Sequence, residues 1–249
     1  MNNISNDLVL FLTACVNPNG MAQTAVQDSQ KRLEQYINAI NFYIKQTSFP
    51  ILVVENTNID LSKYFINEIQ MGRLECLSFS GNNYDRKLGK GYGEGIIINY
   101  AFSNSKMLSK YNYIVKISGR HKVNNINRII NIAELFLRRN NNLIICEINN
   151  KKKFARSDMY ISSKSFYKIY LNSSLKVCDD SKNIWFENVL FDCVKKSVVN
   201  GFQFLFLPLA LDQHGISGTN GKEFKSPRKR RHLHFFFNML MFKFNFYRI

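Results

Sequence analysis

A glycine-rich segment that contains a lysine is the part of the sequence best suited to chemistry. Residues 88–95 carry glycine at every second position, including Gly91 and Gly93, and Lys90 lies between Gly89 and Gly91. Glycine accepts positive φ and lets backbone N–H groups approach a ligand closely. The segment therefore predicts a ligand-binding loop that opens a helix over residues 96–108, whose N-terminus would attract an anion.

Two further cations lie near the end of the next predicted strand, residues 113–117. Lys116 is inside that strand and Arg120 follows it. Ligands of open α/β sheets bind outside the carboxyl ends of the strands. Together with Lys90, these side chains predict a site for phosphate groups. The alternative is an ordinary strand–helix turn, because the glycine spacing matches neither a dinucleotide fingerprint nor a P-loop.

The composition favours an anionic partner. The chain has 249 residues and a formal net charge of +16, which suits nucleic acid, an anionic membrane or a phosphorylated substrate. Its cysteines are widely spaced without a CxxC pair, so we expect no structural zinc and a reducing cytoplasm. The N-terminus lacks a basic region and a cleavage site, and no apolar run is long enough to span a membrane.

Buried-strand and amphipathic-helix patterns alternate along most of the chain. Residues 8–12 form a continuous apolar run, residues 28–46 have helical apolar spacing, and residues 51–54 form a second apolar run. This βαβ order predicts an α/β fold with a mostly parallel central sheet flanked by helices and a Rossmann-like nucleotide-binding half. Further strands are expected at 74–79, 143–148 and 204–207, and further helices at 126–139, 163–171 and 186–200.

The last part of the chain has a different character. Residues 222–249 are rich in Lys and Arg, hold the single acid Glu223, and place the basic cluster 228–231 before an aromatic-rich run. Such a pattern predicts a tail that lies in a membrane interface, beside a catalytic domain of residues 1–221. The alternative is an element that packs on the domain or on a second subunit.

The order of these segments resembles the GT-A-fold glycosyltransferases, particularly bacterial enzymes of lipopolysaccharide and capsule biosynthesis. The resemblance covers about residues 7–215 and rests on architecture more than on a specific signature. It implies that Thr13 and Ala14, after the first strand, hold the nucleobase of a nucleotide-sugar donor. It also implies that Glu55 and Asn56, after the second strand, lie at the nucleoside.

The sequence departs from that family at the metal site. Such enzymes usually carry Asp-x-Asp after the mid-chain strand, where this chain has Ser118-Gly-Arg-His121. We therefore expect no cofactor and no metal site. A divalent ion such as Mn²⁺ or Mg²⁺ is compatible with the resemblance but lacks the motif, and the pair Asp179-Asp180 is more simply a solvated turn. The donor phosphates would be neutralised by Lys90, Lys116 and Arg120.

An inverting sugar transfer also needs a general base for the acceptor hydroxyl. Glu187 opens the predicted helix 186–200, where the resemblance places an acidic residue, although the helix dipole alone also favours Glu there. Asp158, after the turn 154–157, is the rival. His214, in the loop 212–221, is either a phosphate contact or an ordinary loop histidine.

The favoured function is that of a glycosyltransferase, which moves a sugar from a nucleotide-activated donor to a saccharide or lipid-linked acceptor. It would act in the cytoplasm as a peripheral protein on the inner face of the plasma membrane, and its partners would not include nucleic acid. One alternative is a nucleic-acid-binding protein. The net charge of +16 favours it, but the sequence shows no nucleic-acid recognition motif. Another is a non-catalytic adaptor with a degenerate donor site.

The tail generates the first testable prediction. A chain ending at Lys222 should lose binding to vesicles that contain anionic lipid, whereas the full chain should co-sediment with them. Each basic residue near the surface contributes about 1 kcal/mol, so salt should weaken the binding, and the aromatic run should keep salt from abolishing it. Equal sedimentation of both chains would contradict a membrane role. Failure of the shortened chain to fold would indicate a packing element.

Overall fold

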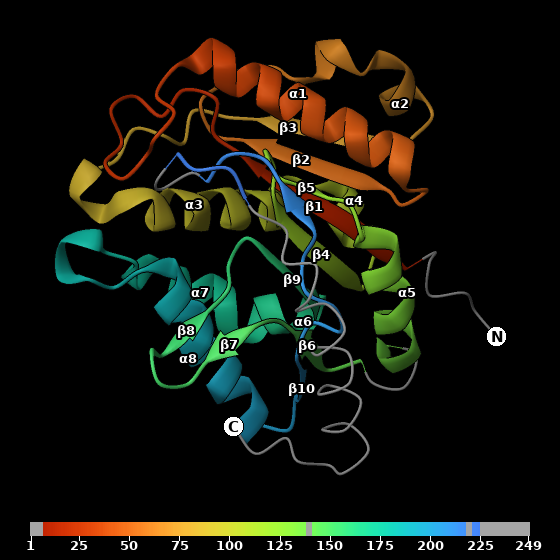
Figure 1. Cartoon of the computed structure of the whole chain (residues 1–249), viewed down its shortest axis with the longest axis vertical. Coiled ribbons are helices and arrows are strands. Elements are labelled where there is room, and N and C mark those ends of the chain that lie inside the picture. The colour runs from red at the N-terminus through yellow and green to blue at the C-terminus, as the bar shows by residue number, and fades with distance from the viewer. Residues whose placement is uncertain (1–6, 138–140, 218–220, 225–249) are drawn as a thin grey trace.

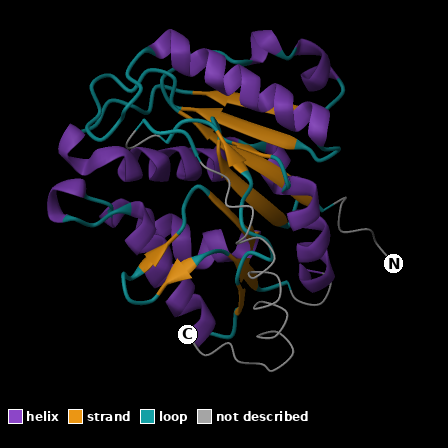
Figure 2. Cartoon of the chain, viewed as in Figure 1, coloured by secondary structure: helices purple, strands orange, loops and turns teal. Residues whose placement is uncertain are grey.

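A seven-stranded sheet forms the centre of the protein (Figures 1 and 2). The computed structural model describes residues 7–137, 141–217 and 221–224. In space the strands of this sheet follow the order β10-β6-β9-β4-β1-β2-β3. They are β1 Leu8–Ala14, β2 Ile51–Glu55, β3 Leu74–Ser78, β4 Tyr113–Ser118, β6 Leu143–Ile145, β9 Met159–Ser163 and β10 Gln203–Leu205.

The first strand has neighbours on both sides in the sheet, and all of its residues are buried, as its continuous apolar run predicted. It pairs in parallel with β2 on one side and β4 on the other, so that Leu10 lies opposite both Ile51 and Val115. Only β9 runs antiparallel to its neighbours β4 and β6 within this sheet. The expected α/β fold with a mostly parallel central sheet is confirmed.

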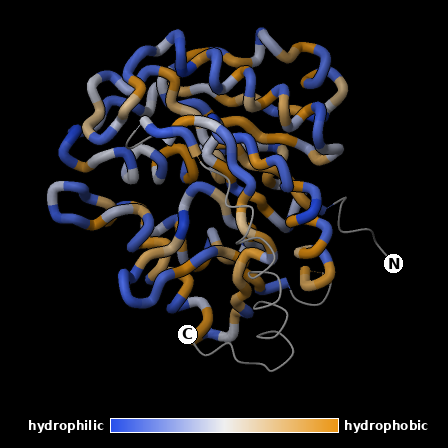
Figure 3. Tube along the Cα trace, in the orientation of Figure 1, coloured by the Kyte–Doolittle hydropathy of each residue, from blue (hydrophilic) through white to orange (hydrophobic). Residues whose placement is uncertain are grey.

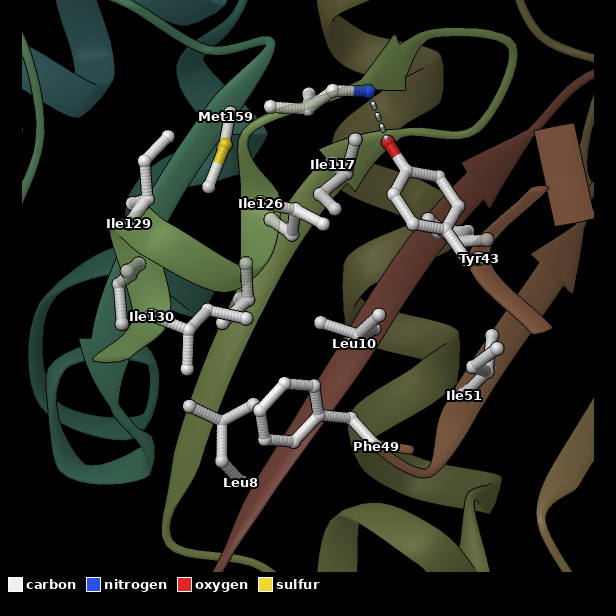
Figure 4. Close-up of a cluster of buried hydrophobic side chains, with 14 of the residues drawn as sticks. Leu8, Leu10, Tyr43, Phe49, Ile51, Ile117, Ile126, Ile129, Ile130 and Met159 are labelled. Carbon is white, nitrogen blue, oxygen red and sulfur yellow. Dashed lines mark hydrogen bonds between the residues drawn. The ribbon is translucent and has the colours of Figure 1, made fainter. Parts of the chain in front are cut away.

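Helices cover both faces of the sheet (Figure 2). The cluster on one face joins Leu8 and Leu10 to Tyr43 of α1 and Ile130 of α5 (Figure 4). The cluster on the other face joins alternate residues of the same strand, such as Phe11, to α3 and α8. The α-helices are α1 Ser29–Gln46, α2 Ile66–Gln70, α3 Gly89–Asn104, α4 Lys106–Lys110, α5 Ile126–Leu137, α6 Lys164–Phe166, α7 Asn172–Ser174 and α8 Phe186–Val199.

The glycine-rich segment is not a loop, so that prediction is wrong. Its glycines lie inside α3, which begins at Gly89 and not at residue 96. A Cβ atom at Gly91 would lie 3.0 Å from Cβ of Phe186, and one at Gly95 would lie 2.9 Å from Cβ of Leu175. The glycines therefore serve close packing around a helix, and tertiary contacts outweigh their low helix propensity.

Other elements differ from the expectation in their ends. The strand expected over 143–148 stops at Ile145, and a hairpin follows, made of β7 Ile148–Asn149 and β8 Phe154–Ala155. The helix expected over 163–171 is α6 followed by a π-helical turn, Tyr167–Leu171. The antiparallel strand β9 was not expected, because its sequence, Met-Tyr-Ile-Ser-Ser, mixes apolar and polar residues although all five are buried.

The chain beyond β10 returns to the end of β4. There β11 Gln213–His214 pairs antiparallel with β5 Lys122–Val123. The predicted membrane tail lies outside the described residues from 225 onward. Within the described part of the chain, none of the helices combines the length and apolar character needed to cross a membrane.

Candidate functional site

A cavity of about 890 Å³ opens at the carboxyl ends of β1 and β4. We call it the strand-end cavity. From β1 it is lined by Thr13 and Ala14, and after β4 by the segment 118–121. Because the chain proceeds from β1 to β2 on one side and later to β4 on the other, this is the point where the strand order reverses. Ligands of open α/β sheets bind at such points.

One wall of the strand-end cavity is basic. Arg120 lines it and donates through NH1 to Oε1 of Gln35 at 2.8 Å. Arg32 of α1, also on the wall, donates to the carbonyl oxygen of Cys15. Burial lowers the pKa of Arg120, and the neighbouring Arg32 charge acts in the same direction. Among the described residues neither arginine has a carboxylate within ion-pair distance. Their charge is left for an anion in the cavity.

The start of α3 adds to this wall. Lys90, Gly91 and Gly93 line the strand-end cavity, as predicted for a ligand-facing segment. Asp180 lies nearby: its burial raises the pKa of its carboxyl, and the Lys90 ammonium opposes that rise. Asp180 also lines the cavity, so it does not belong to a simple solvated turn.

Glu55 does not face the cavity, which corrects the prediction that it contacts the donor. Its side chain is 1% exposed and is not among the lining residues. The carboxylate accepts N–H bonds from Val16 at 2.9 Å, Thr57 at 2.8 Å and Ile59 at 2.9 Å. It ties together the loops after β1 and β2. The neighbouring Asn56 does line the cavity, and its buried Oδ1 has no hydrogen-bond partner among the described residues.

Lys116 is also not a direct phosphate contact. It is 0% exposed and lies beneath the cavity floor. Its ammonium forms an ion pair with Glu94 of α3 and donates to the carbonyl oxygen of Ser157 at 2.6 Å. The rings of Tyr160 and Phe186 lie 5.9 and 5.8 Å from it. A charge buried this deeply must be paired, so Lys116 holds the floor together.

Glu187 lies in the first turn of α8 and lines the strand-end cavity. Its Oε1 accepts a hydrogen bond of 2.7 Å from the Ser157 hydroxyl. The carboxylate is thus oriented by a neutral donor and keeps acceptor capacity for a substrate hydroxyl. This position is compatible with the predicted role as a general base.

Asp158 also lines the cavity, but its carboxylate forms an ion pair with Arg156. Arg156 donates to its two carboxylate oxygens at 2.5 and 2.8 Å. Burial would raise the pKa of Asp158, but the Arg156 guanidinium outweighs burial and holds that pKa below its usual value. Because a paired carboxylate of low pKa is a weak proton acceptor, the geometry favours Glu187 over Asp158 as the base.

The histidine of the site is His121 and not His214. His214 is exposed and does not line the cavity, and its Nε2 lies 3.6 Å from Oδ1 of Asp212. His121 lines it, and its Nδ1 lies 2.7 Å from Nε2 of Gln213. Burial lowers the pKa of His121 to about 4, so the ring is neutral near pH 7.

Nine of the twelve predicted site residues line the cavity, and three lie outside it. The nine are Thr13, Ala14, Asn56, Lys90, Gly91, Gly93, Arg120, Asp158 and Glu187. Glu55, Lys116 and His214 are the three outside. Arg32, Glu94 and His121 also line the cavity but were not predicted as site residues. Arg32 had a usable signal, because it precedes Tyr36 by one helical turn on the buried face of α1.

Within the described residues, no group of three or more His, Cys, Asp and Glu side chains is arranged to hold a metal ion. The side chains at the end of β4, where the resemblance would place Asp-x-Asp, are those of a serine, an arginine and a histidine. These donors do not fit a hard divalent cation, which prefers oxygen ligands.

No family model matches the chain, and neither does any curated protein. Core-mannan synthase A from Aspergillus fumigatus has a similar structure, with 9% identity, a TM-score of 0.47 and coverage of 92% of this chain and 83% of that chain. The S. cerevisiae mannosyltransferase Ktr4p has 10% identity and a TM-score of 0.44, over 85% and 71% of the two chains. A Leptospira borgpetersenii cytidylyltransferase has 13% identity and a TM-score of 0.43, over 83% and 77%. At these low values, function must be argued from this chain's own geometry.

The buried His121 generates a prediction about acid stability. The unfolded chain takes up a proton near the ordinary histidine pKa of about 6.5, whereas the folded chain does so only near pH 4. The free energy of unfolding should therefore fall as the pH drops between these values, by on the order of 3 kcal/mol. In His121→Asn, chemical denaturation at several pH values should show a shallower fall over this window.

The matched control is His214→Asn, which changes an exposed histidine of β11, the strand that pairs with β5 directly after His121. It should keep the slope of the parent protein. An unchanged slope in His121→Asn would show that His121 does not carry the effect.

Proposed function

We propose that the protein is a glycosyltransferase that transfers a sugar from a nucleotide-activated donor to a saccharide or lipid-linked acceptor. One observation carries the proposal. One cavity at the reversal of strand order is lined by the guanidinium groups of Arg32 and Arg120, which have no carboxylate partner among the described residues, and by the carboxylate of Glu187. The first arrangement suits a diphosphate, and the second suits a hydroxyl nucleophile.

The donor would lie along the ends of β1 and β4. We assign the nucleoside to the surface of Thr13, Ala14 and Asn56, where the unmatched Oδ1 of Asn56 would accept an N–H from the base. The diphosphate would lie against Arg120 and Lys90. A guanidinium group can donate two parallel hydrogen bonds to phosphate oxygens, and it stays charged at all ordinary pH values. We therefore infer that these cations neutralise the leaving nucleoside diphosphate without a metal ion.

The acceptor hydroxyl would lie beside Glu187. In an inverting transfer the carboxylate takes the hydroxyl proton while the oxygen bonds to the anomeric carbon, and the bond from that carbon to the diphosphate breaks. The Ser157 hydroxyl keeps the carboxylate in place. The leaving nucleoside diphosphate carries the electron pair to the basic wall, where Arg120 stabilises it.

We further propose a cellular setting in surface polysaccharide or lipopolysaccharide assembly at the inner face of the plasma membrane. The sequence resemblance and the basic, aromatic-rich residues 222–249 support it. The first experiment is to measure binding and hydrolysis or transfer of labelled UDP-, CMP- and GDP-sugars. Binding with no turnover on any acceptor would favour the non-catalytic adaptor, and absence of binding would remove the proposal.

Arg120→Ala should weaken donor binding while leaving the fold intact. A charge-assisted hydrogen bond contributes about 1.5–3 kcal/mol, so the dissociation constant should rise by about 10- to 100-fold. Calorimetry with the bound nucleotide sugar measures the change. The control is Arg128→Ala, which changes an exposed arginine on α5 that does not line the cavity.

Turnover should also persist in excess EDTA, because the arginines and Lys90 would neutralise the diphosphate. Loss of turnover that is restored by Mn²⁺ or Mg²⁺ would contradict metal-independent neutralisation.

Glu187→Gln should lower kcat and kcat/KM together by about 10²- to 10⁴-fold, because a base acts in the transition state. Donor affinity should change little. Asp192→Asn is the matched control, since Asp192 is an exposed acid on the same helix. Full turnover in Glu187→Gln would leave this residue only the favourable interaction with the helix dipole and make Asp158 the candidate base.

A further inference from the structure

The strand-end cavity has an aromatic wall that the donor does not explain. Trp185 and Phe154 both line the cavity, and they are 42% and 37% exposed. Phe186, between Trp185 and Glu187, is only 1% exposed. Trp185 and Phe154 thus offer a ligand in the cavity two partly exposed aromatic rings.

We propose that Trp185 and the β7–β8 hairpin form the acceptor subsite and bind a sugar ring of a saccharide acceptor. This inference rests on the proposed function, because it names the acceptor of the same cavity. A sugar ring has an apolar face of C–H groups and a rim of hydroxyls. Aromatic rings match the face, and the amide of Asn149 and the ammonium of Lys152, which line the cavity from the β7–β8 hairpin, match the rim.

A side chain holds the two parts of this wall in one arrangement. Asn188 of α8 donates through Nδ2 to the carbonyl oxygen of Lys153 at 2.8 Å. Its Oδ1 accepts from the backbone N–H of Trp185 at 3.3 Å. The start of α8 is thus fastened to the turn of the hairpin, which is hydrophilic in Figure 3 and lies beside α8 in Figure 1. The wall is therefore preorganised for a ligand.

The same segments carry the proposed base. Trp185 lies two residues before Glu187. Phe154 lies three residues before Ser157, whose hydroxyl donates to Glu187. A ring on the aromatic wall would thus present a hydroxyl close to Glu187. The basic wall with Arg120 and Lys90 belongs to strand ends, α1 and the start of α3, so the donor and the acceptor would contact different elements.

Trp185 is the single tryptophan of the chain, so its fluorescence reports on this wall alone. The probes are methyl glycosides of glucose, galactose, mannose, N-acetylglucosamine and glucuronic acid, added to the full chain. We expect a saturable change in emission with at least one of them. In Trp185→Ala the acceptor KM should rise about tenfold, while kcat and the dissociation constant of the nucleotide sugar stay unchanged. Trp185→Phe should recover part of the loss.

Tyr64→Ala is the control, because Tyr64 is 43% exposed and lies outside the cavity. The subsite is overturned if no glycoside changes the emission, or if Trp185→Ala leaves the acceptor KM as in the parent. It is also overturned if anionic phosphatidylglycerol vesicles change the emission and glycosides do not, since the wall would then contact a membrane. Failure to bind any nucleotide sugar would instead count against the proposed function, and is measured separately by calorimetry.

Discussion

The buried ammonium of Lys116 is the constraint on which the site depends. A charge with no exposure to solvent is stable only with a counter-ion and further hydrogen-bond partners. Glu94 supplies the first from α3, and the carbonyl oxygen of Ser157 supplies the second from the turn before β9. Lys116 itself belongs to β4, so one side chain joins three parts of the fold beneath the cavity floor.

This constraint explains the composition of α3. Glu94 reaches Lys116 only if its helix lies close to the sheet and to α8. The absence of a Cβ atom at Gly91, where one would lie 3.0 Å from Phe186, permits that approach. The Oε1 atom of Glu94 also accepts from the Thr13 hydroxyl at 3.1 Å, which ties the end of β1 to the same floor. Close packing and charge pairing therefore require each other here.

Local patterns allowed the parallel strands of the sheet and its main helices to be predicted, but not the antiparallel strand β9 or the partners of individual charges. The apolar runs of β1 and β2 and the spacing in α1 were sufficient, because burial periodicity reflects local structure. The alternation of glycines was misleading, since its cause is contact with Phe186 and Leu175, far away in sequence. Likewise, the sequence around Lys116 does not show that its ammonium pairs with Glu94. The sequence around Glu55 does not show that its carboxylate accepts hydrogen bonds from backbone N–H groups.

The pairing pattern separates the charges of the site into two kinds. Lys116 with Glu94 and Arg156 with Asp158 neutralise each other, so these groups stabilise the fold around the cavity. Arg120 and Glu187 instead have hydrogen bonds to neutral groups, the Gln35 amide and the Ser157 hydroxyl. Such bonds fix the direction of a charged group without cancelling its charge. A cation and a carboxylate held in this way can both act on one ligand, because no residue in the described part of the chain forms an ion pair with either of them.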